Sequence, residues 1–339
     1  MMSGLVAPGS VAAVRQASIR ARRVVISTGA GDLQRLGWVW GGGPSTGQPR
    51  PPTEGITVAD RQPADPLLGD DLSTRLNPAV AHPARVYDYW LGGTNNFAAD
   101  REAAEQVISV RPAIRAEVRA NRAFLGRAVR HLTAQAGIRQ FLDIGTGLPS
   151  ADNTHEVAQS VAPEARVVYA DIDPIVLVHG RALLTSTPEG ATAYRDADLR
   201  DTDAVLAAAR QTLKLGEPVA VMLVAMLHHV PDGDDPYGIV ARLVDAVAPG
   251  SYLVLSHPAS DIDVAAVTEV ARRYNARVPA GQQRRSHDEV ARFFSGLELL
   301  EPGIVPTTEW RPSQPAGPAP VPMWAGVGRK PDADGGTGA

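Results

Sequence analysis

The stretch Phe141-Leu142-Asp143-Ile144-Gly145-Thr146-Gly147 decides how this chain is interpreted. An apolar strand pattern ends in an acid and runs into Gly-x-Gly, and a helix pattern soon follows. Glycine has no Cβ, so the two glycines let the backbone turn tightly and approach a bound nucleotide closely. Gly-x-Gly alone is weak evidence, because ordinary turn glycines give the same pattern. The rest of the sequence has to support it.

Strand and helix patterns alternate from this stretch onward, and further helix patterns precede it. Short apolar runs occupy residues 140–144, 166–170, 219–224 and 252–256. Amphipathic stretches occupy residues 98–110, 112–135, 153–161, 174–184, 202–213 and 237–247. Strands spaced by helix-length patterns predict a parallel sheet that is buried on both faces. Two later runs, at 296–302 and 322–328, predict an antiparallel edge.

Acidic residues follow the next two strand patterns. The run at 167–170 ends at Asp171, 24 residues beyond Gly147. An acid at the tip of the second strand can accept both ribose hydroxyls of an adenosine cofactor, although Asp171 could instead be a solvated strand end or cap the helix near Pro174. The run at 192–195 leads to Asp198, which could accept from an adenine amino group with Leu199 beside it. Asp198 could equally cap the helix at 202–213.

Two adjacent histidines, His228 and His229, follow the fourth strand pattern. Open α/β sheets bind ligands at the carboxyl ends of their strands, so either ring could act as a general base. Strand-end histidines also often bond only to backbone or solvent, and that alternative stays open. None of the 8 histidines has the spacing of a metal-ligand set, so we expect no metal site.

The composition of the 339 residues excludes several classes of protein. There is no cysteine, which rules out disulfides, thiolate metal sites and cysteine nucleophiles. The formal net charge of −4 gives no electrostatic footprint for nucleic acid, and no apolar run is long enough to cross a bilayer. The apolar stretch that follows Arg22-Arg23 is too short for the hydrophobic region of a signal peptide. We expect a cytoplasmic protein without nucleic-acid or membrane partners.

The two ends of the chain differ from its middle. The first 70 residues hold 11 glycines and 7 prolines, a level typical of low complexity, and residues 331–339 are polar and glycine-rich. We predict a disordered extension at 1–72, one folded domain at 73–330 and a disordered tail at 331–339.

Taken in order, these features resemble the class I S-adenosylmethionine-dependent methyltransferases. Several stretches resemble, more narrowly, an actinobacterial methyltransferase family once catalogued as a domain of unknown function. They are Arg85-Val86-Tyr87-Asp88-Tyr89-Trp90-Leu91-Gly92-Gly93, Asn121-Arg122-Ala123-Phe124-Leu125, Trp310-Arg311-Pro312, and residues 143–149, 153–159 and 168–174. The resemblance runs from about Ser73 to Lys330.

The resemblance implies an α/β fold with a Rossmann-like, seven-stranded, mostly parallel sheet, helices on both faces and a helical N-terminal addition. It also implies S-adenosyl-L-methionine as the cofactor. Asp143 would hold the amino group of the cofactor, and Ala225 would contact it through its backbone. The other expected cofactor contacts are Gly145, Thr146 and Gly147 at the methionine and ribose, Asp171 with Ile172 beside it at the ribose, Asp198 and Leu199 at the adenine, and Tyr89.

The segment 87–96, which includes Tyr89, combines aromatic rings, a Gly-Gly turn and two asparagines. It could fold over the site as a lid, or it could be a helix end whose aromatics pack on the core. We expect the N-terminal helices and the segment 272–285 to build the acceptor pocket. The acceptor would be a small molecule that the sequence does not disclose, and the oligomeric state stays open.

Three other functions fit parts of the pattern. A non-catalytic protein that binds S-adenosylmethionine or a related nucleoside would have the same cofactor residues. A nicotinamide-dependent oxidoreductase would need a third glycine, which Leu148-Pro149-Ser150 does not supply. A nucleotide-sugar transferase would use Asp171 and Asp173 as a metal-binding Asp-x-Asp, and it is disfavoured because the Gly-x-Gly strand explains Asp171 without a metal. Methyl transfer requires mainly positioning, which suits a chain without an evident nucleophile.

Overall fold

The computed structural model of the chain describes residues 20–23, 38–41, 76–183, 185–312 and 320–332. The chain divides into two compact units, Met1–Pro66 and Leu67–Ala339. In the first unit, β1 (Arg20–Arg23) pairs antiparallel with β2 (Trp38–Gly41), so part of the predicted extension forms regular structure. The rest of that extension and residues 333–339 lie outside the described residues, and their disorder stays a prediction.

The second unit is built on an eight-stranded sheet in the order β5-β4-β3-β6-β7-β10-β8, with β9 paired to β10. The neighbours from β5 to β7 run parallel, and β10 runs antiparallel to β7, β8 and β9. The strands are β3 (Gln140–Ile144), β4 (Arg166–Asp171), β5 (Ala191–Asp196), β6 (Ala220–Val224), β7 (Tyr252–Pro258), β8 (Glu298–Leu299), β9 (Val305–Pro306) and β10 (Met323–Arg329). The Rossmann-like fold and its antiparallel edge are confirmed, and the short strand β9 is added to the seven strands predicted.

Local sequence signals set several of the helix ends. Pro83 is at the start of α2, and Gly92 after its last turn has a left-handed φ of +91°. Ser286 and Glu289 form a capping box at α10. The helices are α2 (Pro83–Leu91), α3 (Ala98–Ile108), α4 (Ile114–Ala134), α5 (Thr154–Val161), α6 (Pro174–Leu183), α7 (Thr202–Arg210), α8 (Pro236–Asp245), α9 (Val264–Asn275) and α10 (His287–Ala291). In the described part of the chain, none is both long and apolar enough to span a membrane.

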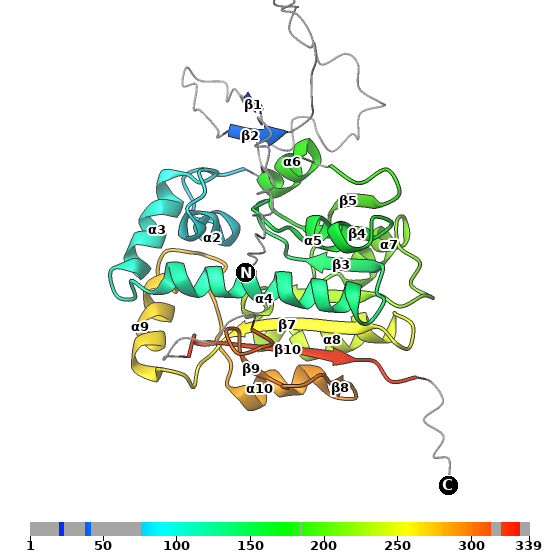
Figure 1. Cartoon of the computed structure of the whole chain (residues 1–339). Helices are drawn as coiled ribbons and strands as arrows, with labels where there is room; N and C mark the ends of the chain where they lie inside the picture. Colours follow the sequence, from blue (N-terminus) through cyan, green and yellow to red (C-terminus); the bar gives the residue numbers. More distant parts are fainter. Residues whose placement is uncertain (1–19, 24–37, 42–75, 184, 313–319, 333–339) are drawn as a thin grey trace, which may run out of the picture. The chain divides into compact units, whose positions relative to one another are not determined.

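Helices cover both faces of the sheet, as predicted (Figure 1). Side chains alternate along β3: Leu142 and Ile144 pack in the cluster that includes α7 and α8, whereas Phe141 packs in the cluster that includes α4 and α5. This period of two is the expected consequence of a strand whose two faces are both buried. The sheet therefore forms a rigid middle layer whose strand ends position the loops.

A separate helical layer is formed by α2, α3, the start of α4, and α9. In Figure 1, α3 and α9 lie on the same side of the molecule although they are far apart in sequence. A buried ion pair joins α2 to α3, with Arg85 Nε 2.9 Å from Asp100 Oδ2. The predicted helical N-terminal addition is thus confirmed, and α9, which has no counterpart among the predicted helices, completes it.

Candidate active site

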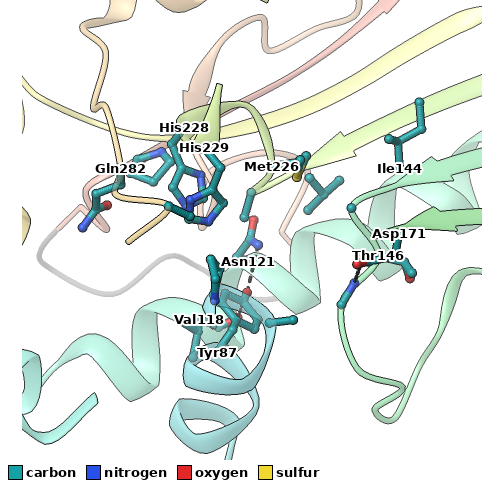
Figure 2. Close-up of a pocket in the computed structure, with 18 of the residues that line it drawn as sticks. Tyr87, Val118, Asn121, Ile144, Thr146, Asp171, Met226, His228, His229 and Gln282 are labelled. Atoms are coloured by element: carbon teal, nitrogen blue, oxygen red, sulfur yellow. Dashed lines mark hydrogen bonds between the residues drawn. The ribbon is translucent and has the colours of Figure 1, made fainter. Parts of the chain in front are cut away.

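One cavity lies at the carboxyl ends of the parallel strands, and α2, α4 and the segment after α9 contribute to its wall (Figure 2). All but one of the predicted site residues line it. They are Asp143, Gly145, Thr146, Gly147, Asp171, Ile172, Asp198, Leu199, Ala225, His228 and His229. Residues from four different strand ends therefore meet at one place.

The glycine loop after β3 has a backbone conformation that glycine adopts easily. Gly145 and Gly147 have φ of +69° and +67°, in the left-handed region that other residues rarely enter. Gly145 N–H donates to Ala170 O at 2.8 Å, and Gly147 N–H donates to Asp171 Oδ2 at 2.9 Å. A Cβ on Gly147 would meet no atom of the described residues within 4 Å. The loop is thus tied to the end of β4 and leaves room for a ligand against its backbone.

Asp171 is buried, and its carboxylate is held from two sides. Oδ2 accepts the Gly147 N–H, and Oδ1 accepts the Asp173 N–H at 2.9 Å. Burial raises the pKa of Asp171, against the lowering effect of these two bonds. The local cap at the start of α6 is instead Asp173, whose Oδ1 accepts the Ile175 N–H at 2.9 Å. Asp171 is therefore neither a solvated strand end nor the helix cap.

Two further acids have local partners. Asp173 Oδ2 lies 2.7 Å from His82 Nδ1, so this carboxylate is engaged within the chain rather than free for a metal. Asp198 lines the cavity, but its Oδ2 lies 3.2 Å from Arg200 Nη1. The N-cap of α7 is Asp201, not Asp198. The Asp198 carboxylate thus does not cap a helix, and it faces the cavity as part of an ion pair with Arg200.

Asp143 and Arg122 lie at the other end of the glycine loop. Asp143 is buried and accepts a 2.6 Å hydrogen bond from Thr154 Oγ1. Burial raises its pKa to about 6, against the lowering effects of the Thr154 bond and the Arg122 charge. Arg122 Nη2 donates to the carbonyl oxygens of Ala151 and Asp152, at 3.3 Å and 3.2 Å, whereas its buried Nε has no hydrogen-bond partner among the described residues. An acid and an incompletely bonded cation therefore line the same part of the cavity.

The turn after β6 has a strained backbone. Ala225 has φ of +54°, a region that costs a residue with a Cβ about 1–2 kcal/mol. Its N–H is held by Ser256, through the carbonyl oxygen at 3.1 Å and Oγ at 3.0 Å. The next side chain, Met226, packs against the glycine loop, and a Cβ on Gly145 would lie 2.3 Å from its Sδ. The turn and the loop therefore constrain each other.

The two histidines form a short 3-10 turn, η2 (Leu227–His229), and their ring centroids are 3.9 Å apart. His229 Nδ1 lies 2.7 Å from Gly281 O, and because a carbonyl only accepts, the proton is on Nδ1 and Nε2 is unprotonated. Burial lowers the pKa of His229 to about 4. Burial and the neighbouring His229 also lower the pKa of His228 well below its ordinary value. Both rings are neutral near pH 7.

Tyr89 does not reach the cavity. Its hydroxyl donates a 2.6 Å hydrogen bond to Glu105 on the exposed side of α3, so the structure does not place this predicted cofactor residue with the others. Tyr87 lines the cavity instead. Two residues of an α-helix turn the side chain by about 200°, so the two tyrosines of α2 point to opposite sides. Trp90 packs in the core, so α2 is a packed helix rather than a loose lid.

Several cavity residues were not among those predicted. They are Tyr87, Glu117, Met226, Tyr274, Gln282 and Arg284. Asn121 and Arg122 belong to a segment that the sequence marks, but α4 could have turned either side toward the sheet. The expectation that the segment 272–285 borders the site agrees with the positions of Tyr274, Gln282 and Arg284. Nothing local in that segment singles these three out.

A Rossmann-like sheet with a glycine loop after its first parallel strand and a buried acid at the tip of the next defines the class of α/β proteins that bind nucleotide-type cofactors. The model of the S-adenosyl methyltransferase family matches residues 70–331. The chain belongs to this family. It is therefore an S-adenosylmethionine-dependent methyltransferase, which confirms the predicted activity and cofactor and sets aside the nicotinamide alternative.

Two solved structures are similar over most of their length. A crystal structure of a DUF574 family protein from Streptomyces avermitilis is 48% identical, with 74% of this chain and 98% of that chain covered and a TM-score of 0.72. A candidate methyltransferase from Thermobifida fusca is 43% identical, with 75% and 96% covered and a TM-score of 0.68. None of the curated proteins matches this chain.

Proposed function

We propose that the cavity holds S-adenosyl-L-methionine with its adenosine at the tips of β4 and β5 and its methionine between Asp143 and Arg122. The observation that carries this proposal is the 2.9 Å bond from Gly147 N–H to Asp171 Oδ2. It fixes a buried carboxylate beside a glycine backbone whose missing Cβ leaves open space. A ribose can lie in that space and donate both hydroxyls to the carboxylate.

The adenosine end combines apolar surface with an acceptor. Ile172 is 39% exposed at the cavity, and a flat base lying on it would remove this apolar surface from water. Leu199 is buried beside the cavity and offers a second apolar contact. Asp198, already paired with Arg200, can accept from the amino group of the base. These residues together favour adenine over a charged group.

The methionine part of the cofactor carries an ammonium and a carboxylate, and this end of the cavity offers one oppositely charged side chain for each. The ammonium would bind the Asp143 carboxylate, and the carboxylate would bind Arg122, whose buried Nε has no partner in the described structure. Such charge-assisted bonds are about twice as strong as neutral ones. The ligand thus satisfies a donor that the chain leaves unbonded.

Bound here, the cofactor supplies an already activated methyl group, so the chain has to position the acceptor and accept its proton. Figure 2 shows the two histidines across the cavity from Thr146 and Asp171. We infer that His229 is the proton acceptor, because its Nε2 is unprotonated and its ring is fixed through Nδ1. The acceptor is a small molecule, since helices α2 and α4 and the segment after α9 wall this side of the cavity.

Substitution of Asp171 tests the proposed cofactor site. Asp171→Ala should weaken the binding of S-adenosylhomocysteine by about 1–3 kcal/mol, because charge-assisted bonds to the ribose are lost. Isothermal titration calorimetry measures the change, and Asp288→Asn, at a fully exposed acid of α10, is the matched control. Equal affinity of Asp171→Ala and the unsubstituted protein would remove Asp171 from the site.

The remaining assignments extend this proposal to the whole chain. We propose that the methyltransferase domain spans 73–330, which the family match at 70–331 supports. We further propose a cytoplasmic location and no nucleic-acid partner, for which the absence of cysteine and the net charge of −4 are the supports. An actinobacterial origin is supported by the sources of the two similar structures, Streptomyces and Thermobifida.

A further inference from the structure

Arg284 lines the cavity with an incompletely bonded guanidinium. It lies between α9 and α10, where its Nη1 donates to Ala259 O at 3.2 Å. Its buried Nε has no hydrogen-bond partner among the described residues. Burial lowers the pKa of Arg284 to about 10, partly countered by the charge of Glu117. A desolvated cation with unfilled donors is unfavourable unless another group completes its bonding.

The acids that line the cavity are already engaged elsewhere. Glu117 Oε1 lies 2.6 Å from Arg111 Nε, and Asp88 Oδ2 accepts from Asn96 Nδ2 at 2.7 Å. The other lining acids are Asp143, Asp171 and Asp198, whose partners are given above. Within the described part of the chain, no ion pair therefore neutralises Arg284.

The neighbouring Arg285 shows the contrast with an arginine that serves the fold. Arg285 is fully buried, and its terminal nitrogens donate to the carbonyl oxygens of Leu227 and Val230, at 3.1 Å and 3.0 Å. They also donate to Asp232 Oδ1 at 2.7 Å. Arg285 thus holds the histidine turn with partners from the chain itself. Arg284, one residue earlier, borders the cavity, and among the described residues its guanidinium has one such bond, to Ala259 O, and no acid within ion-pair distance.

Arg284 lies on the histidine side of the cavity, because the backbone N–H of Gln283, the residue before it, donates to His228 O at 2.7 Å. Apolar and aromatic side chains also line the cavity, among them Ile114, Val118, Val270, Tyr274 and Met323. The rings of His229 and Tyr274 have centroids 6.3 Å apart. Arg284 supplies one positive charge, and the charge of Glu117 partly offsets it. This arrangement fits a ligand group with one negative charge, such as a carboxylate, better than a phosphate with two.

We propose that Arg284 recognises a carboxylate on the methyl acceptor, and that the acceptor is an apolar, ring-bearing monoacid. This inference rests on the proposed function, since it places the acceptor beside the bound cofactor. Arginine and carboxylate form two parallel charge-assisted bonds, which would orient the ring of the acceptor between Arg284 and the histidine turn. Arg284 is a specificity-determining residue in this assignment.

The test uses the full chain saturated with S-adenosylhomocysteine. Benzoate and 2-naphthoate are titrated against benzamide and 2-naphthamide at matched ionic strength, and the shift in the thermal unfolding midpoint is converted to an affinity. The acids should bind better than their amides. Arg284→Gln should lose this preference, with an affinity for the acids reduced by about tenfold or more. Arg284→Lys should retain part of it, and Arg272→Gln, on the exposed face of α9, should retain it all.

A second variant changes affinity in the opposite direction. Glu117→Gln removes the negative charge that acts on Arg284, so it should tighten the binding of benzoate. Equal binding of acid and amide to the unsubstituted protein, or an acid preference that survives in Arg284→Gln, would overturn the proposal. The affinity for S-adenosylhomocysteine is measured in parallel. If the unsubstituted protein does not bind S-adenosylhomocysteine, the proposed cofactor site is contradicted. If it binds S-adenosylhomocysteine but does not prefer the acids over the amides, only the assignment of Arg284 is contradicted.

Discussion

Ser256 Oγ donates a buried 2.6 Å hydrogen bond to Asn121 Oδ1 and so joins β7 to α4 across 135 residues of chain. Ser256 Oγ also accepts the Ala225 N–H at 3.0 Å. On the other side, Asn121 Nδ2 donates to Tyr87 Oη at 3.0 Å, and Tyr87 donates to Val118 O at 3.2 Å (Figure 2). This chain of bonds connects the strained β6 turn to α2 along the cavity wall, and each donor in it has an acceptor.

Breaking this network should lower stability cooperatively. Asn121→Ala leaves the Ser256 hydroxyl without its acceptor, and Ser256→Ala leaves Asn121 Oδ1 without its donor, so each should lower the free energy of unfolding by about 1–3 kcal/mol. The double variant should lose less than the sum, with a coupling of about 0.5–3 kcal/mol. Urea unfolding measures all three. Additive losses would show that the bond contributes nothing, and Thr268→Ala, on the exposed face of α9, is the control.

The half of the cavity proposed for the cofactor could be predicted because its residues stand at strand ends. Asp143, Gly147 and Asp171 lie in β3, in the loop after it and in β4, and parallel pairing brings these ends to one edge of the sheet. The same reasoning left the role of Asp198 open, because an acid before a helix can cap it or face a ligand. In the structure Asp198 lines the cavity and Asp201 supplies the cap, while the contact of Asp198 with a ligand stays a prediction.

The pH dependence of cofactor binding should report Asp143. The ammonium of the ligand binds the ionised carboxylate, and the pKa of this buried group is about 6 in the free protein. Affinity for S-adenosylhomocysteine should therefore be constant above pH 6 and should fall below it, by about tenfold for each further pH unit. Calorimetry between pH 5 and pH 8 measures this. Asp143→Asn should bind weakly with no such dependence, and a wild-type affinity that stays flat to pH 5 would exclude the ammonium contact.

His229 should control the rate of transfer without controlling cofactor binding. His229→Gln should reduce kcat by about 10²–10⁴-fold, the range for loss of a general base, with unchanged affinity for S-adenosylhomocysteine. Because burial holds the pKa of His229 at about 4, the base form persists above that value. In the unsubstituted protein, kcat should thus stay level down to about pH 5 while kcat/KM for the cofactor falls below pH 6.

Transfer of labelled methyl groups to a low-molecular-mass cell extract measures these rates before the acceptor is known. His287→Gln, at a half-exposed histidine of α10, serves as the control and should keep full activity. His228→Ala distinguishes the two rings: if His229 is the base, His228→Ala should act only through the packing of its neighbour. Full activity of His229→Gln would return that ring to a structural role.

The half of the cavity proposed for the acceptor could not be predicted residue by residue, because tertiary packing rather than local pattern brings it together. Tyr87 and Tyr89 are both aromatic residues of one nine-residue helix. The side that faces the cavity depends on how α2 packs against α3 and α9. Arg284 and Arg285 are likewise adjacent and identical in type. Their different environments depend on the path of the segment between α9 and α10 past Ala259 and the histidine turn.

The glycine loop offers a comparison between two positions with the same backbone strain. Gly145→Ala and Gly147→Ala both place a Cβ at φ near +68° (+69° and +67°), so each should cost about 1–2 kcal/mol in the free energy of unfolding. At Gly145 the new Cβ would also lie 2.3 Å from Met226 Sδ, whereas at Gly147 it meets no described atom within 4 Å. Gly145→Ala should therefore be the more destabilising of the two.

A Met226→Ala background separates the steric part from the strain. In that background the extra cost of Gly145→Ala over Gly147→Ala should shrink, because Sδ and Cγ of Met226, at 2.3 Å and 2.6 Å, are gone and only the Cβ at 3.1 Å remains. An undiminished difference would show that the Met226 side chain is not its cause. The open space at Gly147 predicts a second difference. The new Cβ of Gly147→Ala would enter the volume proposed for the ribose. Gly147→Ala should therefore reduce the magnitude of the free energy of binding of S-adenosylhomocysteine by more than it lowers the free energy of unfolding. A Gly147→Ala variant that binds this ligand normally would place the ribose elsewhere than against the loop.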